Sequence, residues 1–172
     1  MRNDMRLFFF VWICGATTLG AVQTQSPADP VREVEIDQID VICRVEGRQL
    51  IVDPGFEVRT KQASCAALLV QGDAVLDKLN PSMLDARLDY DPNEKAYRIT
   101  WPEAGRHRVD ATFIARGEPE PNSPWQRASL RLPDSRLRQI RLTSGQPDLE
   151  VDLPGALRVQ RRVDQGQVVV EA

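Results

Sequence analysis

The sequence predicts an all-β protein, an antiparallel β-sandwich of about ten short strands preceded by a signal peptide. Three observations support this prediction. Apolar and polar residues alternate with a period of two along most of the chain, as they do in half-buried strands. Gly, Pro, Asp and Asn interrupt these runs at near-regular spacing. Helical periodicity is scarce, and a length of 172 residues suits a single sandwich domain.

Residues 1–26 are predicted to form a secretory signal peptide. Arg2 and Arg6 supply the basic start, and an apolar stretch of about 16 residues follows, shorter than the ~20 residues that cross a bilayer as a helix. Small residues near position 20 offer a cleavage site. Cleavage would give an exported protein, located in the periplasm, in the cell envelope or outside the cell. Without cleavage, the segment would act as a membrane anchor.

The sandwich domain is predicted to span residues 34–172, after a proline-containing linker at residues 27–33. The strand expected at 49–53 should stop at Pro54 and Gly55, because both residues favour turns. In the first half of the domain we expect strands at 39–45, at 49–53, at 56–60, within 64–79 on both sides of Gly72 and Asp73, and at 84–90.

The run from Tyr97 to Phe113 reads as two alternating strands joined by a tight connection. One strand ends at Trp101, the other starts near His107, and Pro102 and Gly105 supply turn chemistry between them. This pair is expected to be central to the fold. A stiff proline loop at 118–124 should follow it. Further strands are expected at 125–132, 140–142, 149–153, 157–159 and 168–170.

Several stretches resemble β-rich modules near the N-terminus of large exported bacterial proteins of unknown function. They are Ala-Gly-Arg-His-Arg-Val-Asp-Ala-Thr-Phe at 104–113, Trp125, Leu-Arg-Leu-Pro at 130–133 and Asp-Leu-Glu-Val-Asp-Leu-Pro-Gly-Ala at 148–156. The resemblance covers residues 40–172. It implies a sandwich-like module of an envelope protein and assigns no functional residue.

The charge balance gives no electrostatic reason to bind nucleic acid or anionic lipid. The net charge is −3, and a mildly acidic domain lacks the basic surface that such partners need. Five arginines nevertheless lie close together in sequence, which could form an anion- or polysaccharide-binding stripe or a face balanced by acidic neighbours. They are Arg127, Arg131, Arg136, Arg138 and Arg141.

Cys43 and Cys65 are a candidate disulfide pair. Removal of the signal peptide takes away Cys14 and leaves these two cysteines in a compartment that permits disulfides. The alternative is a pair of buried thiols that pack as small apolar side chains.

The segment around Asp89, Asp91 and Asn93 offers oxygen ligands at alternate positions, as calcium sites often do. It departs from the EF-hand pattern in its sixth and twelfth positions. A hairpin turn explains the same residues through the backbone preferences of Asp, Pro and Asn.

Trp101 and Trp125 could form a platform for sugars or other small ligands if both reached the surface. Trp101 shares its row with apolar residues, which favours packing in the core. His107 is the only histidine, so we interpret it as a partly buried strand residue and not as a zinc ligand or a member of a catalytic triad.

These observations together predict an exported, non-catalytic interaction or structural module of the bacterial envelope, without a cofactor. The alternative is a carbohydrate- or small-ligand-binding module. The expected partner is another envelope protein or another module of the same assembly. Contact with a membrane is expected only through an uncleaved signal segment.

Overall fold

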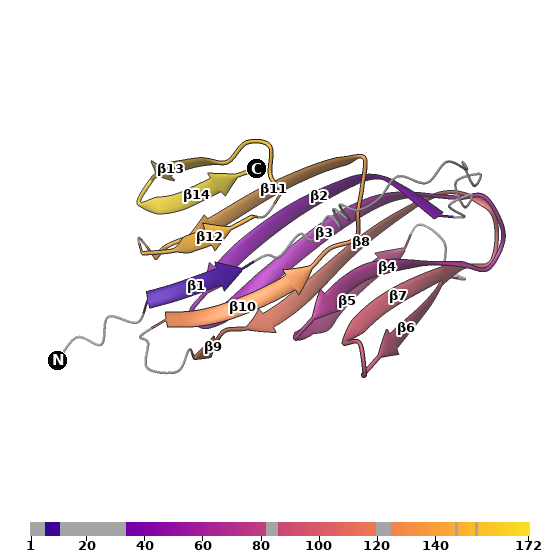
Figure 1. Ribbon diagram of the computed structural model, residues 1–172, viewed down its shortest axis with the longest axis horizontal. Coiled ribbons are helices and arrows are strands. Elements are labelled where there is room, and N and C mark those ends of the chain that lie inside the picture. Colours follow the sequence, from indigo (N-terminus) through magenta and orange to yellow (C-terminus); the bar gives the residue numbers. More distant parts are fainter. Residues whose placement is uncertain (1–5, 11–33, 82–85, 120–124, 147, 154) are drawn as a thin grey trace, which may run out of the picture.

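The chain folds into two packed β-sheets (Figure 1). In this computed structural model the described residues are 6–10, 34–81, 86–119, 125–146, 148–153 and 155–172. Within these ranges every regular element is a strand, and none is a helix. The described residues therefore contain no helix long and apolar enough to span a membrane. The predicted all-β sandwich is confirmed.

The first sheet contains the longer strands and has the order β13-β14-β11-β2-β3-β8-β5. Neighbouring strands are antiparallel except β2 and β11, which run parallel. Its strands are β2 (Val34–Glu46), β3 (Gln49–Thr60), β5 (Ala74–Pro81), β8 (Gly105–Arg116), β11 (Leu137–Ser144), β13 (Gln160–Asp164) and β14 (Gln167–Glu171).

The second sheet has the order β12-β1-β10-β4-β7-β6, with the short β9 added beside β10. In it, β1 runs parallel to both of its neighbours. Its strands are β1 (Arg6–Phe10), β4 (Cys65–Gly72), β6 (Arg87–Asp91), β7 (Ala96–Trp101), β9 (Glu118–Pro119), β10 (Trp125–Arg131) and β12 (Glu150–Asp152).

The core lies between the two sheets, because alternate side chains of each strand point inward. Along β8 the rows separate clearly, with His107, Val109, Ala111 and Phe113 buried and most of the residues between them more exposed. The largest fully buried side chains come from both sheets and meet in the middle: Trp101, Phe56, Phe113, Ile39, Leu50, Leu69, Ile99, Leu142, Leu149 and Val58.

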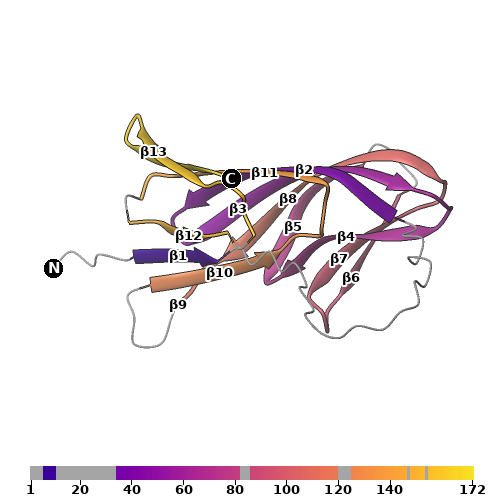
Figure 2. The same cartoon turned by 45° about the horizontal axis from the view of Figure 1, so that its top comes forward.

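The two strands expected around residues 97–113 exist, but they do not form a pair. Strand β7 pairs with β4 and β6 in the second sheet, whereas β8 pairs with β3 and β5 in the first. The connection at 102–104 is therefore a corner between sheets (Figure 2). Alternation gave the strands correctly but could not show which sheet each one joins.

The turn expected at Pro54 and Gly55 is wrong, because β3 runs through both residues. Pro54 pairs with Val41 of β2, and the pairing with β8 is interrupted next to it, so its missing N–H costs little there. At Gly55 a Cβ would lie 2.9 Å from the carboxylate of Asp110, so that side chain would have to shift to admit a larger residue. Glycine here permits close packing instead of a turn.

Two other strand predictions had different outcomes. The ambiguous segment 64–79 does form strands, β4 and β5, which separate near Asp73 into different sheets. The strand expected at Leu157 and Val159 is wrong: both side chains are exposed, and the strand starts only at Gln160. The apolar residues alternate here, but neither of them faces the core.

Of the two alternatives for Cys43 and Cys65, the structure shows two buried thiols and not the candidate disulfide. Cys43 lies nine residues along β2 from Val34, which is roughly 30 Å of extended strand. Cys65 lies just beyond the turn after Thr60, which pairs with Val34 at the opposite end of β2. A disulfide needs the two Cα atoms within about 7 Å.

The predicted signal peptide falls mostly outside the described residues, which include only 6–10 of it. Those residues form β1, so the signal peptide stays a prediction. The predicted linker at 27–33 also lies outside the described residues. Of the proline loop expected at 118–124, the described part is β9, which pairs with β10.

Trp101→Ala should lower the free energy of unfolding by about 3–5 kcal/mol, because the indole is fully buried and its removal leaves a cavity. Urea unfolding followed by circular dichroism measures this. Val75→Ala is the control: Val75 is 67% exposed, and we expect a change within about 0.5 kcal/mol. Equal losses in both variants would contradict the described core.

Cys43 should resist alkylation in the folded protein at pH 8. Burial, assisted by the nearby carboxylate of Asp53, raises the pKa of its thiol to about 12, so almost no thiolate is present. Mass spectrometry after iodoacetamide treatment should find Cys43 modified only after denaturation. Rapid labelling of the native protein, or a Cys43–Cys65 linkage in the unreduced protein, would contradict this structure.

Candidate functional site

The candidate site is an open crevice of about 420 Å³ where the two sheets meet at one end of the sandwich. One wall comes from the start of β2 in the first sheet, and another from β4 in the second. The third is the loop that joins β10 to β11. The lining residues are Val34, Glu35, Ile36, Ala66, Ala67, Leu68, Pro133, Asp134, Ser135 and Arg136.

The pairing of β2 with β3 places charged side chains beside this crevice. Glu35 pairs with Arg59, and a register shift between Ile36 and Gln38 leaves Asp37 as an extra residue on β2. Such a bulge bends a strand and redirects its side chains. The two carboxylates thus come close to the basic residues at the end of β3.

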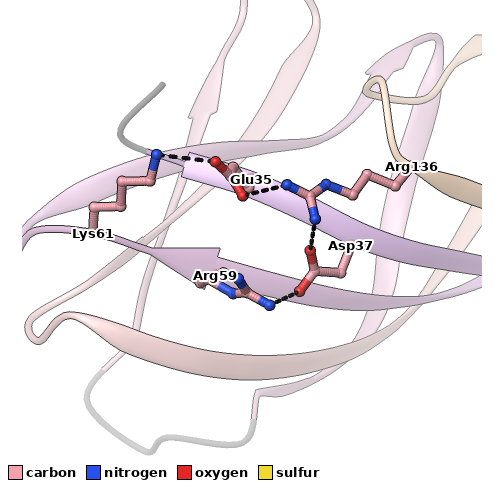
Figure 3. A network of polar contacts seen from close by, with 5 residues as sticks. All are labelled: Glu35, Asp37, Arg59, Lys61 and Arg136. Atoms are coloured by element: carbon pink, nitrogen blue, oxygen red, sulfur yellow. Dashed lines mark hydrogen bonds and ion pairs between the residues drawn. The ribbon is translucent and has the colours of Figure 1, made fainter. Parts of the chain in front are cut away.

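Five charged side chains form one continuous network at the rim, which we call the rim network (Figure 3). Glu35 accepts contacts from Lys61 Nζ at 3.0 Å and from Arg136 Nη2 at 3.0 Å. Asp37 contacts Arg59 Nη2 at 2.9 Å and Arg136 Nη1 at 3.8 Å. Arg136 therefore bridges the two carboxylates.

Arg136 also fixes the third wall of the crevice. Its backbone N–H donates to the carbonyl of Ile36 at 3.1 Å, which holds the loop against β2. Its side chain is 67% exposed, whereas Glu35 is only 21% exposed. The rim thus presents a cation to solvent above partly covered carboxylates.

The cations lower the pKa of Glu35 below its ordinary value of 4.5. The largest cause is the hydrogen bond from Lys61, followed by the charge of that ammonium group, and Arg136 and Arg59 act in the same direction. Glu35 therefore stays ionised at neutral pH and into mildly acidic solution.

Two polar atoms beside the crevice lack hydrogen-bond partners within the described part of the chain. They are Ser135 Oγ and Asp37 Oδ1, of which the second has only the 3.8 Å contact with Arg136. Both atoms are buried and therefore not accessible to a partner, whereas residues such as Ile36 and Leu68 give the crevice an apolar lining. A mixed apolar floor and charged rim is typical of protein interfaces.

The structure does not bring the two predicted tryptophans together as a ligand platform. Trp101 is fully buried, and its ring stacks on that of His107 with centroids 4.7 Å apart. Trp125 begins β10, and its side chain lies outside the described residues. Packing is thus the observed role of Trp101.

His107 is a buried strand residue, as interpreted from the sequence. Its Nε2 lies 3.0 Å from Thr60 Oγ1. Burial lowers its pKa below the ordinary 6.5, although the backbone carbonyl of Glu103 acts in the opposite direction. In the described residues, no group of three or more His, Cys, Asp and Glu could hold a metal ion.

The proposed calcium ligands lie in the hairpin between β6 and β7. Asp91 Oδ1 accepts the backbone N–H of Asn93 at 2.9 Å and that of Glu94 at 3.3 Å. Asp89 forms an ion pair with Arg87 at 2.9 Å. These contacts match the turn interpretation, since the Asp91 carboxylate caps backbone donors.

The arginines considered either as an anion-binding stripe or as a face balanced by acidic neighbours have different surroundings. Arg136 joins the rim network, Arg138 donates to the carbonyl of Pro133, and Arg141 lies near Glu171. Glu35, Asp37, Arg59 and Lys61 were not predicted from the sequence as site residues. The sequence did contain one signal for them, the turn at Gly47. If the strands on either side of this turn pair as a hairpin, Glu35 comes to lie near Arg59. The bulge at Asp37 has no signature in the sequence.

The sequence matches no protein-family model and no curated protein. Solved structures of peptidases are similar in fold. The M1 zinc metallopeptidase of Deinococcus radiodurans has a TM-score of 0.52 and 10% identity, over 81% of this chain and 38% of that one. Aminopeptidase A of Legionella pneumophila has a TM-score of 0.54 and 12% identity, over 81% of this chain and 19% of that one.

This likeness concerns the fold, and the chain spans less than two fifths of the length of either peptidase. It nevertheless contradicts the expected exported, non-catalytic interaction or structural module of the bacterial envelope. The similar structures are portions of peptidases, one of which is named as a zinc metallopeptidase. Sequence reasoning could not reach this result, because identity of 10–12% leaves no motif to recognise.

Glu35→Gln should reduce stability more at pH 7 than at pH 3. A carboxyl whose folded pKa is lowered contributes stability above its unfolded pKa, near 4.5, and loses it as the pH falls through the lower folded value. Urea unfolding at both pH values tests this. Glu46→Gln, at the opposite end of β2, is the control. A Glu35→Gln penalty independent of pH would contradict the network.

Proposed function

We propose that this chain is a peptidase-associated β domain that works beside the catalytic part of a zinc aminopeptidase. The single observation behind the proposal is the fold shared with portions of peptidases over 81% of the chain. In those peptidases the matched portion is less than two fifths of the protein. The remainder would correspond here to another domain or another chain.

In this proposal the chain itself does not hydrolyse peptides. A catalytic zinc ion is commonly held by two histidines and a glutamate, and this chain contains one histidine. That histidine is buried beneath Trp101, and burial favours its neutral form. Its role is to pack and hydrogen-bond at the corner between the sheets.

The crevice with its rim network is the surface we assign to contact with the peptidase. Its apolar lining can bury apolar side chains, and its exposed cation, Arg136, can pair with a carboxylate of the partner. The predicted signal peptide would send this chain to an exported compartment, so the peptidase would have to be present in the same compartment.

The test is purification of the tagged full chain from its native host, followed by an assay of the eluate with fluorogenic aminoacyl substrates. We expect aminopeptidase activity to co-purify, to be lost with a zinc chelator and to return with added zinc. Arg136→Glu should remove most of the co-purified activity because it reverses the exposed charge. The same chain made alone should be inactive.

The control is Arg162→Glu, which breaks a similar ion pair with Glu171 at 3.1 Å at the edge of the first sheet formed by β13 and β14, two strands removed from β2. It should retain the co-purified activity, and thermal melting should show both variants folded. The proposal would be wrong if the eluate were inactive, if its activity did not depend on zinc, or if both variants behaved alike.

A further inference from the structure

One strand of the second sheet, β1, is an insertion that holds two other strands together. It pairs with β10 from Arg6 opposite Trp125 to Phe10 opposite Ser129. On its other side it pairs with β12 from Phe8 opposite Glu150 to Phe10 opposite Asp152. Strands β10 and β12 are therefore joined only through β1 in the sheet order, as Figures 1 and 2 show.

This strand lies within residues 1–26, the segment predicted to be cleaved as a signal peptide. Cleavage would leave the facing edges of β10 and β12 without the strand between them. Unpaired backbone N–H and C=O groups at such edges readily pair with another strand. The inner row of β10 is buried, with Gln126, Ala128 and Leu130 almost inaccessible, so the opening would also reach the core.

The space left by β1, which we call the β1 slot, has a defined shape and chemistry. Neighbouring strands lie about 4.8 Å apart, so two edges joined through one strand accept a single strand. The segment seated there has the sequence Arg-Leu-Phe-Phe-Phe and runs parallel to both neighbours. The slot thus suits an extended apolar segment of about five residues without proline.

The part of the chain that directly follows the predicted cleavage site is a poor replacement. Residues 27–33 read Pro-Ala-Asp-Pro-Val-Arg-Glu, with two prolines that lack an N–H and three charged side chains. Such a segment can neither complete the backbone pairing nor cover an apolar core. A strand from another molecule would not have these two obstacles.

We propose that the β1 slot of the processed protein accepts an apolar strand from a partner protein, parallel to β10 and β12. The signal segment occupies the slot until cleavage, and the partner's strand then completes the second sheet. Main-chain pairing supplies affinity, and the apolar character of the strand supplies selectivity. The slot is at a different place from the crevice and does not depend on the proposed association with a peptidase.

A strand-exchange experiment on the full chain tests this proposal. A specific protease site is inserted between Ser26 and Pro27, and the folded chain is cut there in vitro. An excess of fluorescent peptide Arg-Leu-Phe-Phe-Phe with a solubilising lysine tail is then added. We expect it to displace the residue 1–26 fragment and to co-elute with the domain in gel filtration.

The matched control peptide carries proline in place of Phe8. It keeps the remaining apolar residues but loses a backbone donor in the middle of the strand. Its affinity should therefore be lower by a factor of roughly ten or more. If the cut chain aggregates, protection by the first peptide and not by the proline peptide supports the slot. Equal binding, equal protection, no uptake of either peptide or failure to release the fragment would overturn it.

A cross-link in the uncut chain independently tests the position and register of β1 beside β10. Phe8→Cys with Arg127→Cys joins register partners, whose Cα atoms in neighbouring strands lie about 4.8 Å apart, within disulfide range. Mild oxidation should link this pair in a Cys14→Ser background. The pair Phe8→Cys with Arg131→Cys is off register and should stay reduced. Equal linkage of both pairs, or linkage of neither, would overturn the proposal.

Discussion

The corner between β7 and β8 is the constraint on which the rest of the sandwich depends. There the chain leaves one sheet and enters the other within three residues, so the two sheets are fixed face to face. Trp101 closes the end of β7 and stacks on His107 near the start of β8. Thr60 joins them: its hydroxyl lies 3.0 Å from His107 Nε2 and accepts the N–H of Gly105 at 3.1 Å.

The same end of the molecule carries the candidate site, and this is a consequence of the corner. Thr60 pairs with both Val34 and Gly105, so the end of β3 brings Arg59 and Lys61 next to the start of β2. The crevice lies between the start of β2, β4 and the loop that joins β10 to β11. The β1 slot lies elsewhere in the second sheet, between β10 and β12. The crevice and the β1 slot can therefore bind different partners independently.

Part of the candidate site was accessible from sequence. The hairpin turn at Gly47 predicts that the start of β2 faces the end of β3, and Arg136 belongs to an arginine cluster visible in the sequence. The bulge at Asp37 was not accessible, because no residue type requires it. The loop at Pro133 to Arg136 reaches Glu35 across about a hundred residues of chain, and only the fold creates that contact.

The sequence by itself determined the fold class, because a period of two and regular turn residues leave few alternatives to strands packed in sheets. It also determined that Trp101 and His107 would lie inward, since each shares a row with apolar neighbours. Only the tertiary structure decided that β7 and β8 belong to different sheets, that β3 continues through Pro54 and Gly55, and that Cys43 and Cys65 lie far apart. Alternation records which face of a strand is buried, whereas partner choice depends on contacts between residues distant in the chain.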